Sequence, residues 1–143
     1  MSSITSANSI LMLGVTSLFA VPQQIQGFAT DDMFDFDVME RAEAQMGVDG
    51  RLTGGWVAVP LSGSLSLQGD SPSNDFFDAW NGAQVAQRDI YYGFGTLTLP
   101  SLGKKYTFPK GILRTFQPIV SAGKTLKPRK FAITWEGYTP API

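Results

Sequence analysis

Alternation of apolar and polar positions is the main pattern along this chain, and it predicts β-strands. Between positions 33 and 38, Phe34, Phe36 and Val38 alternate with aspartates, as a strand with one wet face requires. Segment 56–67 also alternates, and we interpret it as one long strand that bends at Ser62-Gly63, while Pro60 indicates an edge strand or a bulge. Further strands are predicted at 9–15, 24–29, 90–99, 104–108, 112–120 and 128–136.

One helix is predicted, and the sequence SPSNDFFDAW marks its start. The side chain of Ser71 or Ser73 can accept a hydrogen bond from the first turn, while Pro72 has the dihedral angle that a first turn requires. Asp75 suits the positive end of the helix dipole, and we expect the helix to end near Gln87. Its apolar face, which should pack on the sheet, consists of Phe76, Phe77, Trp80 and Ala83.

The remaining segments lack this alternation. Segment 40–55 is charged and rich in glycine, which predicts a long loop because it is too polar for a core. Positions 1–8 and the proline-rich positions 138–143 are predicted to be arms. No internal repeat or linker divides the chain, so we expect a single domain over 1–143. The predicted fold class is mainly β, a β-sandwich or barrel with one flanking α-helix.

Composition excludes most catalytic chemistry. The chain has 143 residues, of which 43% are hydrophobic, and it contains neither cysteine nor histidine. Disulfides, the usual zinc sites and nucleophile–histidine relays are therefore excluded. We predict no catalytic residue, no metal site and no cofactor. The longest apolar stretch, 10–21, is shorter than the roughly 20 residues of a membrane-spanning helix, so no membrane insertion is predicted.

Asp35 and Asp37 are the candidates for paired-carboxylate chemistry, because both project from one strand face about 7 Å apart. A catalytic pair needs one carboxyl group that is buried enough to keep its proton. A solvated strand face explains these two residues more simply. The other acidic residues nearby do not follow the spacing of a calcium-binding loop.

Charge is distributed unevenly along the chain. Residues 1–89 carry 11 acidic and 3 basic side chains, whereas residues 90–143 carry 1 and 8. The basic part is interleaved with aromatic residues, which is typical of a barrel that binds single-stranded nucleic acid. The low pI of about 5.2 argues against that alternative. The same asymmetry would also let the basic surface of one copy meet the acidic surface of another.

Two segments carry a resemblance to a known family. They are Ser62–Gly82 (SGSLSLQGDSPSNDFFDAWNG) and Thr107–Gly137 (TFPKGILRTFQPIVSAGKTLKPRKFAITWEG), and both resemble the tail tube proteins of contractile-tailed bacteriophages. The resemblance implies subunits whose sheets join into a hexameric ring, with rings stacked into a tube around a channel for genome ejection. The tube would be assembled in the host cytoplasm and reside in the virion.

The resemblance also implies partners, namely further copies of this chain, the tail sheath, a baseplate initiator and a tail terminator. Viral DNA would pass through the channel without specific binding. Baseplate tube initiators and the tubes of pyocins and secretion machines are similar in fold, so an initiator role stays open.

Site residues follow from this resemblance. Asp35 and Asp37 are candidates for the channel wall, where negative charge repels DNA phosphates. Contacts between subunits or rings are predicted for charged residues in segment 40–55 and in the basic part of the chain. These are Glu40, Glu43, Asp49, Arg51, Lys124, Lys127, Arg129 and Lys130.

Overall fold

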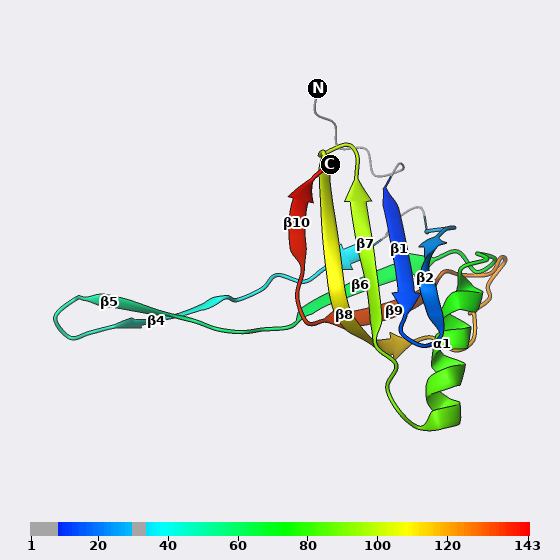
Figure 1. The fold of residues 1–143 in the computed structure, drawn as a ribbon, viewed down its shortest axis with the longest axis horizontal. Coiled ribbons are helices and arrows are strands. Elements are labelled where there is room, and N and C mark those ends of the chain that lie inside the picture. The colour runs from blue at the N-terminus through cyan, green and yellow to red at the C-terminus, as the bar shows by residue number, and fades with distance from the viewer. Residues whose placement is uncertain (1–8, 30–33) are drawn as a thin grey trace.

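The computed structural model describes residues 9–29 and 34–143, which form ten strands and one helix (Figure 1). No helix among them is long and apolar enough to cross a membrane. In chain order the elements are β1 (Ile10–Val15), β2 (Phe19–Ile25), β3 (Phe34–Phe36), β4 (Ala42–Met46), β5 (Leu52–Trp56), β6 (Leu61–Leu67), α1 (Asn74–Gln87), β7 (Gly93–Leu99), β8 (Lys104–Phe116), β9 (Arg129–Trp135) and β10 (Thr139–Pro142).

One antiparallel sheet, folded over on itself, makes the body of the molecule. Its strand order is β2-β1-β7-β8-β9-β6-β3, with β10 also paired to β8. The long strand β8 belongs to both layers, because β7 and β10 pair with its first half and β9 with its second half. Figure 1 shows β9, β6 and β3 crossing behind the other strands. The predicted sandwich with a flanking helix is confirmed, and the sheet does not close into a barrel.

The predicted break between the strands at 104–108 and 112–120 is wrong, since residues 109–111 lie inside β8. The register between β7 and β8 shifts here, from Gly93 opposite Gly111 to Gly95 opposite Phe108. Pro109 therefore lies in a β-bulge, where its missing N–H costs no ladder hydrogen bond. The bulge lets a single strand serve both layers.

The core lies between the two layers, and α1 closes one end of it. Phe77 of the helix stacks on Phe131 of β9 with 4.2 Å between ring centroids, and Phe76 stacks on Phe19 at 4.8 Å. The indole N–H of Trp80 donates a hydrogen bond to the Tyr91 carbonyl, in the segment that follows the helix, at 2.9 Å. The predicted apolar helix face is thus confirmed for these aromatic residues, all of which are buried.

The helix starts where predicted, but its two serine side chains bind the backbone of another segment of the chain. Ser73 occupies the N-cap position without a capping hydrogen bond from its side chain. Instead its Oγ accepts a hydrogen bond from the N–H of Gln26 at 2.8 Å, and the Ser71 hydroxyl donates to the Gln26 carbonyl. Both serines therefore attach the start of the helix to the chain that follows β2.

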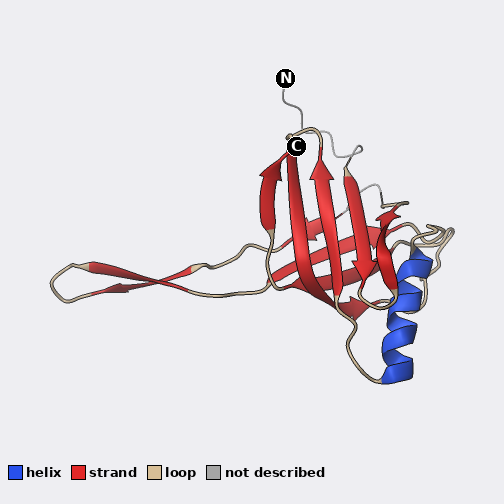
Figure 2. Ribbon diagram, viewed as in Figure 1, coloured by secondary structure: helices blue, strands red, loops and turns tan. Residues whose placement is uncertain are grey.

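The segment between positions 34 and 67 forms one long hairpin. Its base is the β3–β6 pair in the main sheet, and its tip is the separate two-stranded sheet β4–β5, which extends far from the sandwich (Figure 2). The predicted loop at 40–55 is consequently a hairpin. The predicted strand at 56–67 is two strands, since Trp56 ends β5 and Leu61 begins β6.

Other boundaries also differ from the predictions. The C-terminal segment is paired along β8 as β10 rather than projecting as an arm. The second strand lies at 19–25, because β1 turns back on itself sooner than the pattern suggested. Val38 is 96% exposed and takes no part in the apolar face of β3. The predicted arm at 1–8 lies outside the described residues.

Candidate assembly interface

The β4–β5 hairpin is amphipathic, and neither of its faces is covered. Residues directly opposite each other in the pair share a face, and the register places Met46 opposite Leu52 and Ala42 opposite Trp56. The alternate positions, among them Glu43, form a polar face. Trp56 is 74% exposed, Met46 66% and Leu52 65%. An isolated two-stranded hairpin is marginally stable in water, so its apolar face indicates a site of contact with another molecule.

An apolar cleft opens between the two layers of the sandwich, beside the base of the hairpin. Its volume is about 440 Å³. Phe34, Phe36 and Met39 line one side, and Leu99 and Tyr106 line the other. The core is therefore incompletely covered at this end, whereas α1 covers the opposite end.

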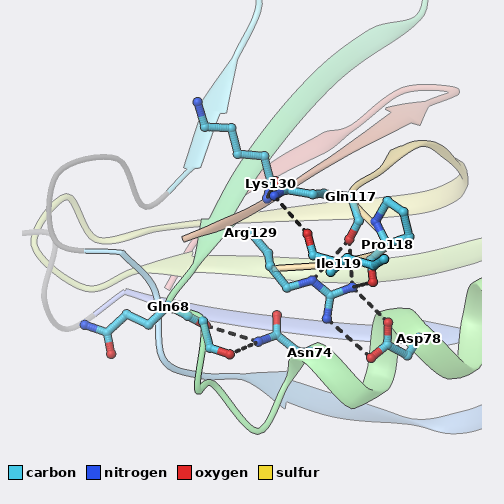
Figure 3. Close-up of polar contacts among 9 residues, drawn as sticks. Gln68, Asn74, Asp78, Gln117, Pro118, Ile119, Arg129 and Lys130 are labelled. Atoms are coloured by element: carbon cyan, nitrogen blue, oxygen red, sulfur yellow. Dashed lines mark hydrogen bonds and ion pairs between the residues drawn. The ribbon is translucent and has the colours of Figure 1, made fainter. Parts of the chain in front are cut away.

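Arg129 is buried, with 6% of its surface exposed. Its guanidinium forms an ion pair with Asp78 of α1 at 2.9 Å. The same group donates two hydrogen bonds to the Gln117 carbonyl, at 2.8 and 3.1 Å, and the Lys130 N–H donates to the Gln117 side chain (Figure 3). Arg129 thus ties the end of β8 to the helix within one subunit. Because this guanidinium is used internally, we remove Arg129 from the predicted contact residues.

The other charged residues predicted to make contacts are exposed, but they fall into two separate groups. Glu40, Glu43, Asp49 and Arg51 lie on or beside the hairpin, whereas the predicted lysines lie at or near the β8–β9 loop. In Figure 1 the hairpin and that loop lie at opposite ends of the molecule. A contact between the two groups therefore requires two copies, as head-to-tail assembly would supply. The lysines are Lys124, Lys127 and Lys130.

Asp35 lies in β3 and Asp37 directly follows that strand, and both are exposed. Asp35 is opposite Ser64 of β6 in the sheet, and the Asp37 N–H donates to the Ser62 carbonyl. Across residues 9–29 and 34–143, no group of three acidic, histidine or cysteine side chains is arranged to hold a metal ion. The assignment of Asp35 and Asp37 to a channel wall stays a prediction.

The apolar residues of the hairpin were missed at the sequence level. The alternation was present in the runs Ala42–Met46 and Leu52–Trp56, but acidic residues on one strand and glycines on the other suggested a loop. Period-two alternation on both sides of a Gly-Val-Asp-Gly turn is the signal that identifies this hairpin.

The described residues thus form a two-layer β-sandwich with a projecting amphipathic hairpin and an apolar cleft beside the base of that hairpin. The chain belongs to the family described as tail fiber protein gp32, which matches residues 2–139. It is accordingly a tail-associated structural protein of the contractile-tail type. A search of curated proteins found no match.

Solved structures of contractile injection systems have a similar fold. A chain of the anti-feeding prophage tube-terminating cap has a TM-score of 0.62 and 10% identity, covering 100% of this chain and 93% of that one. A chain of the anti-feeding prophage baseplate has a TM-score of 0.60 and 10% identity, with coverages of 99% and 97%. A chain of the PVC sheath–tube complex in the extended state has a TM-score of 0.58 and 10% identity, with coverages of 93% and 88%. At this identity the likeness concerns the fold.

Proposed function

We propose that this protein is the repeating subunit of a tail tube, in which hexameric rings stack around a channel for the genome. The observation that carries the proposal is the β4–β5 hairpin. In a monomer the apolar side chains of Met46, Leu52 and Trp56 are largely exposed to water, whereas a stacked tube supplies every copy with a neighbour. Assembly then stabilises the hairpin and covers its apolar face.

The similar folds support this role. They belong to assemblies whose titles name a sheath–tube complex, a tube-terminating cap and a baseplate. By that likeness we propose the tail sheath, a baseplate initiator and a terminator as partners, with DNA passing through without specific binding. The family description names a fibre, but a sandwich with open sheet edges favours ring assembly. The proposed role is structural and involves no catalysis.

A second candidate is a ring at one end of the tube, such as a baseplate initiator or a cap. The likeness to chains of the baseplate and cap structures favours it, because these matches cover more of both chains than the match in the sheath–tube complex does. Such a ring would assemble once per particle and would not propagate. The two candidates therefore differ in whether rings stack on one another.

Electron microscopy of the purified protein across a concentration series tests both candidates. We expect hollow tubes of uniform width, whereas single rings at every concentration would favour the end-ring candidate. The double variant Leu52→Ser/Trp56→Ser should prevent assembly, while the matched change Gln45→Ser/Thr53→Ser on the polar face should not. A wild-type protein that is folded and monomeric at every concentration would contradict both candidates.

A further inference from the structure

Three strands of the main sheet have one edge that no described strand covers along its whole length, namely β2, β3 and β10. A neighbouring copy can extend the sheet only where an edge presents backbone N–H and C=O groups outward. The backbone groups of successive residues point alternately to the two sides of a strand. One known backbone hydrogen bond in a strand therefore determines which of its residues point their N–H and C=O groups toward the neighbouring strand and which point them outward.

The edge at β10 is closed to a further strand. The Ile143 N–H donates to the Gly103 carbonyl of the β8 side at 3.0 Å. Ala141 and Thr139, two and four positions before Ile143, also point their backbone groups toward β8. The backbone groups of Pro140 and Pro142 therefore point outward. Because proline has no N–H, this edge presents acceptors but no donors.

The outward positions of β2 follow from its neighbour. The Thr16 N–H donates to the Tyr92 carbonyl at 3.0 Å, so the even-numbered residues of β1 face β7. The odd-numbered residue Leu11 then faces β2, where it pairs with Ile25. Gln24 therefore points its backbone groups outward.

The outward positions on either side of Gln24 are blocked or already used. Beyond the strand, both backbone groups of Gln26 are bound by the hydroxyls of Ser71 and Ser73 at the start of α1. On the other side Pro22 has no N–H to offer. Between Pro22 and Gln26, Gln24 is therefore the one residue with both a free outward N–H and a free outward C=O group, which is too little for strand addition along this stretch.

The edge at β3 is open. The Asp37 N–H donates to the Ser62 carbonyl at 2.9 Å, so Asp37 and Asp35 face β6. Phe34 and Phe36 point their backbone N–H and C=O groups outward, although their side chains pack against the core. Neither residue is a proline, and no described strand lies on this side.

The hairpin tip has open edges of its own. The Val57 N–H donates to the Arg41 carbonyl at 2.8 Å, and the Gly47 N–H donates to the Arg51 carbonyl at 2.9 Å. The odd-numbered residues of β4 and β5 thus face each other, and the even-numbered residues face outward. No proline occurs in either strand, so both edges present donors and acceptors.

We propose that the β4–β5 hairpin of one copy adds to the β3 edge of a neighbouring copy and turns its apolar face toward the cleft there. Strand addition would satisfy the outward backbone groups of Phe34 and Phe36. It would also bring Trp56 and Leu52 over the side of the cleft that contains Met39. Because the hairpin projects away from its own sandwich (Figure 1), the β3 edge to which it adds is that of a second copy of this chain. This inference rests on the proposed assembly into a tube or ring.

Two variants separate the two halves of this contact. In the hairpin-less variant, residues 42–56 are replaced by Asn-Gly, a two-residue turn that can join Arg41 to Val57. In the edge-blocked variant, Val38→Pro removes the next outward N–H after Phe36 and puts a ring in its place. Val38→Ala is the matched control, because it truncates the same exposed side chain but retains the N–H.

We expect each of the two variants alone to be monomeric, by light scattering on a sizing column. Their mixture should form a 1:1 heterodimer, because one copy supplies only the hairpin and the other only the β3 edge. Val38→Ala should assemble like the wild type. Absence of the heterodimer, or normal assembly of Val38→Pro, would overturn this inference while wild-type assembly upheld the proposed function. A monomeric wild type would overturn both.

Hydrogen exchange on the wild type gives an independent measurement that needs no variant. Assembly should slow exchange at the Phe34 and Phe36 amides by on the order of tenfold or more, while the outward Gln24 amide should be unaffected. Equal exchange at Phe34 and Phe36 in the monomer and the assembly would overturn the inference. Circular dichroism of both variants checks that the sandwich is folded.

Discussion

Strands β5 and β6 are close in sequence and alternate in a similar way, yet their surroundings differ completely. β6 buries Leu61, Leu65 and Leu67, whereas every residue of β5 is exposed. β6 has β3 and β9 on its two sides and the second layer over its apolar face, whereas β5 has β4 alone. Alternation therefore identifies a strand and its apolar face, but it does not reveal which molecule covers that face.

The largest contrast between the sandwich and the hairpin should come from their tryptophans. Trp80→Ala removes a fully buried ring and its hydrogen bond to the Tyr91 carbonyl, which should lower the free energy of unfolding by about 3–5 kcal/mol. Trp56→Ala on the exposed hairpin should change it by no more than about 0.5 kcal/mol. Urea denaturation of the monomer measures both values.

For assembly, unlike for the stability of the monomer, Trp56 should be the tryptophan that matters. Among variants that fold, Trp56→Ala should impair the formation of tubes or rings, because Trp56 belongs to the apolar face proposed to meet a neighbour. The measurement is the fraction of protein that sediments, compared with that of the polar-face variant Thr53→Ser. Wild-type sedimentation of Trp56→Ala would show that the apolar hairpin face is not an interface.

Two arginines give the second contrast. Arg129→Gln removes the two hydrogen bonds from this buried guanidinium to the part-buried Gln117 carbonyl, together with the ion pair to Asp78, and should cost about 2–3 kcal/mol of stability. The share of Asp78 is small, since that side chain is half exposed and solvent screens the pair. Arg41 lies over the Trp56 ring at 5.8 Å, so Arg41→Gln should cost about 0.5 kcal/mol or less. Thermal unfolding compares the two variants, and equal costs would contradict an internal role for Arg129.

Much of the sandwich could be predicted because its strands and helix carry their own signals. The aromatic face of α1 was predicted from spacing alone, and the structure buries it. Strand boundaries were harder to predict where pairing with distant strands overrides a local turn signal. Pro109 suggested a turn, but pairing of β8 with both β7 and β9 keeps the strand continuous.

The candidate interface was predictable only in outline. Charged residues of the hairpin, such as Glu43 and Arg51, were chosen from their exposure and charge, and both are exposed. Arg129 was misjudged, because its sequence neighbours are basic and solvated while strand alternation turns this one residue inward. Which sheet edge is open depends on long-range register, and neither composition nor periodicity contains that information.

Glycines provide a smaller contrast between the two regions. At Gly111 an added Cβ would overlap the Trp135 ring, so Gly111→Ala should cost about 1–3 kcal/mol through overpacking. At Gly55 in the hairpin a Cβ meets nothing within 4 Å, and Gly55→Ala should be neutral within about 0.5 kcal/mol. Chemical denaturation distinguishes the two. A neutral Gly111→Ala would mean that the core there can rearrange around a methyl group.

The smallest effect on stability is expected at the closed edge of the sandwich. Pro140→Ala/Pro142→Ala restores two outward N–H groups on β10 while leaving the bonds to β8 in place, so unfolding should change by at most about 0.5 kcal/mol. Association should nevertheless change, because an edge with both donors and acceptors invites strand pairing. In the hairpin-less background, we expect concentration-dependent light scattering from this variant and none from its parent. Pro128→Ala, which lies outside the strands, is the control, and equal scattering from all three proteins would show that the two prolines do not close the edge.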